Sequence, residues 1–220
     1  MSRSRRVAFL HTGAVVIAPV ADLARQHLGG ATTVNYLDDK IVADLGDADL
    51  AGSVPERISD LVQAAKSAGA DIVMLTCSSI SQLAAPTAQR IGIPVLRIDE
   101  AMADQAVSLG SRIAVLATLP TTLTPTTALI RERAELAGAA PDISGDVIDG
   151  AFAAVSGGDR PTHDRLVGAA IEQAARTADV VVLAQASMAS AAEGVHVEVP
   201  VLTSLEPGIK RLREAVDALP

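Results

Sequence analysis

The chain has 220 residues, of which 49% are hydrophobic and 20% charged, and its formal net charge is -8. Aromatic residues amount to only 1%, which argues against a stacking platform for nucleobases. Beyond the first six residues no cluster of Lys and Arg stands out, so we expect no nucleic acid among the partners.

Cysteine usage and hydropathy narrow the class further. The single cysteine, Cys77, excludes an internal disulfide framework and a multi-thiolate metal site, and it fits the reducing cytoplasm that we expect for this chain. No segment approaches the ~18 continuous apolar residues of a membrane span, so no membrane partner is expected. The N-terminus resembles the start of a signal peptide, but His11 and Pro19 interrupt the apolar run. We therefore predict a short basic leader, Met1 to Arg6, at the start of a first strand.

Apolar runs and helix-compatible segments alternate along the first half of the chain. We predict strands at residues 6–10, 32–37, 71–75 and 93–97. We predict helices at residues 17–28, 53–67, 80–90 and 100–109. Ser53, with Glu56 three positions on, is expected to form a capping box at the start of its helix, after an irregular acidic stretch at 44–52.

The pattern then restarts, with a period of roughly one hundred residues. Residues 112–118 repeat 6–12, residues 178–187 repeat 70–79 without a gap, and residues 199–202 repeat 93–96. A strand is predicted at 143–148, and helices at 125–136, 161–176 and 206–218. The loop at 117–122 follows the first strand of this second half.

Near-continuous apolar strands that alternate with helices are typical of parallel sheets with helices on both faces. We therefore predict the α/β class, with two similar Rossmann-like lobes related by pseudo-twofold symmetry. The first lobe covers residues 1–98 and the second 99–220, and the closing helix at 206–218 is a candidate to pack on the first lobe. Ligands of such sheets bind beyond the carboxyl ends of the strands, so we expect the strand-end loops to line one cleft.

Cys77 lies where a buried strand passes into a helix. Unpaired backbone N–H groups at such a junction stabilise negative charge, so a thiol there can ionise. The alternative is a small buried residue, as free cysteines often are. His11 also ends a strand, and it is a candidate acid or base or else a structural histidine.

Further candidates are polar residues of the same loops. Hydroxyl groups could hold a carboxylate and then an enolate, although Ser and Thr are also ordinary caps and turn formers. The candidates are Thr12, Ser78, Ser79, Thr118, Thr121 and Thr122. Gln185, with Ala186 and Ser187 beside it, could orient a carboxylate or carbonyl group, or cap the following helix. His163 is read as part of a helix cap, and no metal or cofactor is needed to explain the residues.

The sequence Thr76-Cys77-Ser78-Ser79, the turn Ala117 to Thr122 and the duplication together resemble the Asp/Glu racemase superfamily. This superfamily includes aspartate, glutamate and hydantoin racemases, maleate isomerase and arylmalonate decarboxylase. The resemblance implies one cysteine in each half, but this chain carries Gln185 at the second position. An amide neither gains nor loses a proton near neutral pH, so two-thiol racemisation is not expected.

The resemblance implies a cofactor-independent isomerase or racemase-like enzyme that acts on a small carboxylate through Cys77 in the inter-lobe cleft. His11 is the candidate for the second acid or base. The alternatives are a single-cysteine decarboxylase, a cis–trans isomerase, or a carboxylate-binding module without catalysis. The resemblance also allows a homodimer.

Overall fold

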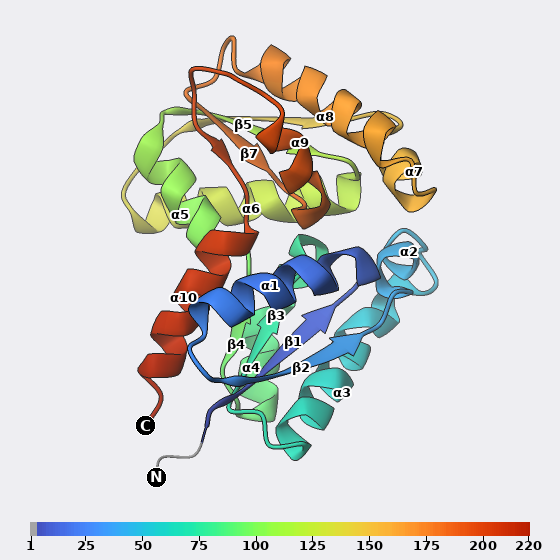
Figure 1. Ribbon diagram of the computed structural model, residues 1–220, viewed down its shortest axis with the longest axis vertical. Coiled ribbons are helices and arrows are strands. Elements are labelled where there is room, and N and C mark those ends of the chain that lie inside the picture. Colours follow the sequence, from blue (N-terminus) through green and yellow to red (C-terminus); the bar gives the residue numbers. More distant parts are fainter. Residues whose placement is uncertain (1–3) are drawn as a thin grey trace. The chain divides into compact units, whose positions relative to one another are not determined.

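The computed structural model describes residues 4–220, which form two compact units (Figure 1). Unit 1 comprises the chain up to Ile98 together with Leu205–Pro220, and unit 2 comprises Asp99–Ser204. The first three residues of the predicted basic leader lie outside the described residues. Among residues 4–220, no helix is both long enough and apolar enough to span a membrane.

Unit 1 is built on a four-stranded parallel sheet in the order β2-β1-β3-β4. The strands are β1 (Arg6–His11), β2 (Thr32–Leu37), β3 (Ile72–Leu75) and β4 (Val95–Arg97). Every residue of β3 is buried, because helices cover both faces of the sheet at this strand.

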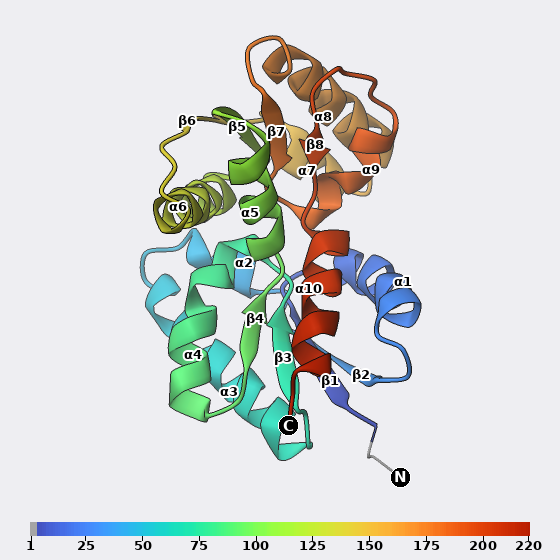
Figure 2. The same cartoon turned by 90° about the vertical axis from the view of Figure 1, so that its left-hand side faces the viewer.

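The helices of unit 1 lie on the two faces of this sheet, as Figures 1 and 2 show from two directions. One face carries α1 (Ile17–His27) and α10 (Leu205–Asp217), and the other carries α3 (Val54–Ser67) and α4 (Ala84–Ile91). Shorter segments are α2 (Ile41–Leu45) and the 3₁₀ helices η1 (Ala14–Val16), η2 (Ala51–Ser53) and η3 (Ser78–Leu83).

Unit 2 repeats this architecture, with a parallel sheet in the order β6-β5-β7-β8. The strands are β5 (Arg112–Ala117), β6 (Asp142–Val147), β7 (Val180–Leu183) and β8 (Val201–Leu202). The helices α5 (Glu100–Leu109) and α6 (Pro120–Leu136) share one face. The other face carries α7 (Ala151–Ser156), α8 (Arg160–Ala174), η4 (Ala186–Met188) and α9 (Ala189–Glu193).

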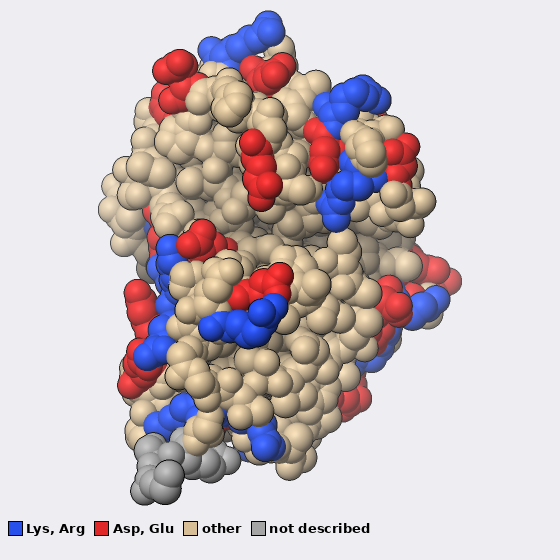
Figure 3. Space-filling view, viewed as in Figure 1, with Lys and Arg blue, Asp and Glu red and all other residues tan. Residues whose placement is uncertain are grey.

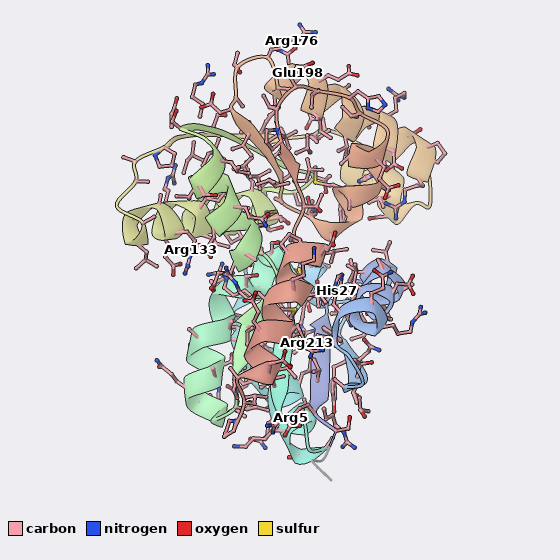
Figure 4. The ribbon with its side chains drawn as sticks, turned by 60° about the vertical axis from the view of Figure 1, so that its left-hand side comes forward. Arg5, His27, Arg133, Arg176, Glu198 and Arg213 are labelled. Atoms are coloured by element: carbon pink, nitrogen blue, oxygen red, sulfur yellow. The ribbon has the colours of Figure 1, made fainter. Side chains whose placement is uncertain are left out.

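The identical strand order in both units confirms the α/β class and the duplication that the sequence predicted. The helix that follows β4 belongs to unit 2, whereas the helix that follows β8, α10, belongs to unit 1. In Figure 4, Arg213 of α10 lies beside His27 at the end of α1, and its guanidinium Nη1 donates to the His27 carbonyl at 3.4 Å.

Ion pairs join surface helices to each other or link successive turns of one helix. In unit 2, Arg133 of α6 donates to Asp104 of α5 at 2.5 Å, and this contact raises the arginine's pKa. On α10, Lys210 pairs with Glu206 at 2.8 Å. On the face shown in Figure 3, basic side chains are interleaved with acidic ones.

Two predicted details of the helices are wrong. Ser53 does not form a capping box, because its hydroxyl donates to the Leu50 carbonyl and the Glu56 carboxylate binds Arg90 instead. The helix predicted from Pro125 begins at Pro120, which suits a first helical position. Pro125 lies inside this helix, where its missing N–H removes one hydrogen bond.

Gly208 is the glycine of α10, and it packs directly against the backbone at Ile98. A Cβ atom placed there would lie well under 3.0 Å from the backbone oxygen of Ile98. Backbone atoms move less readily than a side-chain end, so the helix must shift to accept even a methyl group.

We predict that Gly208→Ala lowers the free energy of unfolding by about 1–3 kcal/mol, since the clash exceeds the gain of about 1 kcal/mol in helix propensity. Urea denaturation measures this change. Gly52→Ala is the control, because no atom lies within 4 Å of the added Cβ there. Equal stability of the two variants would contradict the packing argument.

Candidate active-site edges in the two units

The strand order places a topological switch point at the same place in each unit. The chain leaves β1 toward β2 on one side and reaches β3 on the other, so the loops after β1 and β3 diverge. In unit 2 the same holds for β5 and β7. Ligands of α/β sheets bind at such a point, beyond the carboxyl ends of the strands. The residues there are His11, Thr12, Thr76 and Cys77 in unit 1 and Thr118 and Gln185 in unit 2.

Cys77 and Gln185 have matching backbone conformations. Cys77 has φ -128° and ψ 123°, and Gln185 has φ -123° and ψ 137°. Both residues are half-buried, and each directly precedes a 3₁₀ helix. The structure thus places the thiol of unit 1 and the amide of unit 2 at equivalent points, as the sequence repeat indicates.

The turn after Cys77 is rich in buried hydroxyl groups. Ser78 and Ser79 begin η3 and are buried, and the hydroxyl of Ser81 donates to the Cys77 carbonyl at 3.3 Å. The predicted α-helix at this point starts later, at Ala84, because the first turns have 3₁₀ geometry. Thr12, at the end of β1, is also buried. These side chains give the unit 1 edge its hydrogen-bonding character.

His11 joins three strand ends of unit 1. Its Nδ1 lies 2.8 Å from the Thr76 hydroxyl and its Nε2 lies 2.9 Å from Oδ1 of Asn35. The Thr76 hydroxyl also lies 3.0 Å from the Leu10 carbonyl, and its single hydrogen can serve either this carbonyl or Nδ1, while Nε2–H donates to Asn35. Burial lowers the pKa of His11, which favours the neutral ring with the Thr76 hydroxyl donating to Nδ1.

This geometry changes the role that the sequence suggested for His11. The side chain is fully buried, and both ring nitrogens are engaged in hydrogen bonds. A group in this state positions the strand ends and has no nitrogen to offer a substrate. We therefore assign His11 a structural role and do not propose it as the second acid or base. Asn35 of β2 is part of the same arrangement.

Gln185 is held in a defined orientation by Thr118. Its Oε1 accepts the Thr118 backbone N–H at 2.6 Å and the Thr118 hydroxyl at 2.9 Å. A backbone N–H can only donate, so the bound atom must be the carbonyl oxygen of the amide. The NH₂ group therefore points away from Thr118. Among the described residues, no hydrogen bond of this NH₂ group is recorded.

The other predicted residues of unit 2 lie near this pair. Ala186 and Ser187 form the half-buried start of η4, and the Ser187 carbonyl accepts a hydrogen bond from Arg160 of α8 at 2.7 Å. Thr121 and Thr122 were expected in a loop, but they lie in the first turn of α6. Thr122 is buried and Thr121 half-buried. Within residues 4–220, no group of three or more His, Cys, Asp or Glu side chains is arranged to bind a metal ion.

Solved structures share this two-unit α/β fold over most of their length. A glutamate racemase from Francisella tularensis, in complex with D-glutamate, matches 97% of this chain and 81% of its own, with a TM-score of 0.77 and 12% identity. An allantoin racemase from Klebsiella pneumoniae matches 98% and 89%, with a TM-score of 0.68 and 19% identity. A mutant of arylmalonate decarboxylase in a sulfate-associated form matches 96% and 92%, with a TM-score of 0.62 and 18% identity. At these identities the likeness shows the fold alone.

The fold is that of a duplicated α/β protein, and the sequence identifies the family. The model of the Asp/Glu/hydantoin racemase family matches residues 10–212. The chain therefore belongs to this family, which supports an enzyme of the racemase or isomerase class. Curated proteins give no sequence match.

The buried neutral ring of His11 predicts a pH-dependent stability. Its folded pKa is lowered from the ordinary value of 6.5 by burial, so the unfolded chain binds a proton that the folded chain refuses. The contribution of His11 to stability is present above pH 6.5 and is lost as the pH falls from there through the folded pKa. Urea unfolding between pH 8 and pH 5 (roughly the window in which histidine titrates) measures it.

We expect His11→Gln to reduce the loss of stability between these pH values. His196→Gln is the control, because His196 is exposed and meets solvent in both the folded and the unfolded chain. An unchanged pH dependence in His11→Gln would contradict the assignment of a buried neutral ring.

Proposed function

We propose that this chain is a cofactor-independent isomerase of the racemase type that acts on a small carboxylate through Cys77. The observation that carries the proposal is the position of Cys77 at the switch point of unit 1, beside buried hydroxyl groups. Membership of the Asp/Glu/hydantoin racemase family supports the reaction class. We further propose that the Thr118–Gln185 edge of unit 2 contributes to binding the same substrate.

The proposed substrate site is rich in hydrogen-bond donors. A carboxylate oxygen accepts hydrogen bonds from hydroxyl and amide groups, and these bonds strengthen as negative charge moves onto the oxygen. Ser78, Ser79 and Thr12 would supply such donors from unit 1, and the NH₂ group of Gln185 would supply them from unit 2. Donors fixed before the reaction stabilise the charge without reorganising. The net charge of -8 does not prevent anion binding, because local donors act at shorter range.

The proposed chemical step is a proton transfer at the α-carbon. The Cys77 thiolate takes the α-proton and becomes a thiol, and the electron pair of the C–H bond moves into the carboxylate to form an enediolate. In the return step the thiol gives its proton to the carbon and the electron pair re-forms the C–H bond. No atom or electron is left over, so no cofactor is required for this step.

Gln185 gives this proposal a particular stereochemical consequence. An amide cannot accept or release a proton near neutral pH, so Gln185 cannot serve the face opposite to Cys77. One thiol alone would remove and return the proton on the same face, which exchanges the proton with solvent but does not invert the α-carbon. Isomerisation would therefore need a further proton donor, such as a water molecule, on the opposite face. This observation favours, as a second candidate, a single-cysteine decarboxylase in which loss of CO₂ leaves an enediolate that Cys77 protonates. A cis–trans isomerase would use the thiol as a nucleophile.

A binding module without catalysis remains the alternative from a different class, because the hydroxyl and amide donors would suit carboxylate binding alone. Location in the cytoplasm and assembly as a homodimer stay predictions from the sequence and the family resemblance.

We predict that the chain incorporates solvent deuterium at the α-carbon of a small acid, and that Cys77→Ser lowers this rate by about 10²–10⁴-fold, the usual contribution of a positioned proton-transfer group. The assay is ¹H NMR in D₂O over a panel of 2-amino, 2-hydroxy and malonic acids. Ser108→Ala is the control, because Ser108 is exposed on α5.

Two results would contradict the proposed reaction. One is exchange that continues at the same rate in Cys77→Ser. The other is binding of an acid without exchange or turnover of any member of the panel, which would favour the binding module.

A further inference from the structure

His163 is a buried histidine that the proposed reaction does not use. It lies in the first turn of α8, its side chain is fully buried, and its Nδ1 lies 2.7 Å from the carboxylate of Asp164. A contact this short places a proton on Nδ1, and in that tautomer of the uncharged ring Nε2 presents a lone pair. Among the described residues, Nε2 has no hydrogen-bond partner although it is inaccessible to water. An unpaired buried acceptor costs stability unless a ligand or a water satisfies it.

The spacing of α8 against the sheet shows which residues share a layer with His163. The stripe His163, Val167 and Ile171 repeats every four residues, a rise of about 6 Å in a helix. Alternate strand residues are about 6.6 Å apart, so each step on α8 matches a two-residue step on the strands it covers. Val167 packs in one cluster with Leu116 and Leu183.

By the same spacing, the next layer toward the carboxyl ends of the strands is expected to hold His163 on the helix and Thr118 and Gln185 on the sheet. These two strand-end residues follow Leu116 and Leu183 on the same face, and they are in mutual contact. Nδ1 of His163 is directed to Asp164, whose carboxylate also accepts from the exposed Ser190 hydroxyl at 3.0 Å. Nε2 is buried and without a partner among the described residues, so it is expected to face the interior of this layer.

On this placement, the Gln185 NH₂ group and the His163 Nε2 share one layer of unit 2, and neither has a hydrogen-bond partner among the described residues. Gln185 offers an N–H donor that is turned away from Thr118, and His163 offers a lone pair. We propose that these two groups form a subsite for a hydroxyl group of the ligand, whose oxygen accepts from Gln185 and whose O–H donates to His163. This inference rests on the proposed function and adds that the small carboxylate is a hydroxy acid.

The chemistry of the pair selects against other substituents. An ammonium group has no lone pair for the Gln185 N–H, and a second carboxylate has no proton for His163. A methyl ether has an acceptor but no donor. At the start of α3, the helix of unit 1 that corresponds to α8, the buried residue is Val54, which has no hydrogen-bond acceptor in its side chain. The Nε2 acceptor of His163 therefore distinguishes unit 2 from unit 1. Rejection arises because the wrong group leaves a buried polar atom unpaired.

The test is an NMR titration of the full chain labelled with ¹⁵N. The probes are lactate and 3-hydroxybutyrate, each compared with its O-methyl ether. We expect a hydroxy acid to move the Nε2 resonance of His163 to lower frequency as the lone pair accepts a proton donor, and its ether to leave that resonance in place. We expect His163→Val to weaken binding of that hydroxy acid by about tenfold or more while binding of the ether is unchanged.

The inference is overturned if the ethers move the Nε2 resonance as the hydroxy acids do, or if neither hydroxy acid moves it. The wild-type titration decides even if His163→Val fails to fold. A response of His163 without Cys77-dependent exchange would leave the subsite standing and remove the proposed reaction. Cys77-dependent exchange without a response of His163 would leave the proposed reaction standing and remove the subsite.

Discussion

The parallel pairing of β1 with β3, repeated as β5 with β7, is the constraint on which the rest of the structure depends. Because the strand order reverses between these parallel strands, each unit has one point where two strand-end loops diverge. All the chemistry that we assign to the chain lies at these two points. The strands β1, β3, β5 and β7 are almost wholly buried. The centre of each sheet is therefore a fixed support for short polar loops.

The two units keep the same backbone at this point and differ in the groups that it carries. Unit 1 has a half-buried thiol, with buried serines in the turn that follows and a buried threonine at the neighbouring strand end. Unit 2 has an amide whose carbonyl is fixed by Thr118 and whose NH₂ group is turned outward from that bond. A thiol can move a proton and an amide can only donate or accept a hydrogen bond. On the proposed function, the two halves of the duplication would divide proton transfer and substrate binding between them.

Much of this could be predicted from the sequence, because the apolar strands are long and the repeat aligns without a gap. The α/β class, the duplication and the placement of Cys77 and Gln185 at strand ends follow from those patterns. The start of α6 at Pro120 could not be predicted, because a proline inside a helix and a proline at its first position look alike in sequence.

The roles of single polar residues also depended on the structure. His11 looked like a free acid or base, and only the packing of β2 against β1 brings Asn35 to its second nitrogen. His163 looked like part of a cap, and the burial of its ring appears only when α8 is laid on the sheet. The actual cap of that helix is Asp159, whose side chain accepts the Thr162 N–H. Contacts between residues far apart in sequence carry no local signal.

The central claim is that Cys77 and the Gln185 position serve the same substrate. Cys77 is the only cysteine, so Gln185→Cys creates a chain with just two thiols. Treatment of this variant with dibromobimane, which fluoresces strongly only when both of its arms are alkylated, tests whether the two positions come together. The account predicts intramolecular fluorescence that a small carboxylate suppresses and that Gln185→Cys combined with Cys77→Ser lacks. Two reactive thiols that are each alkylated without forming the fluorescent bridge would contradict it.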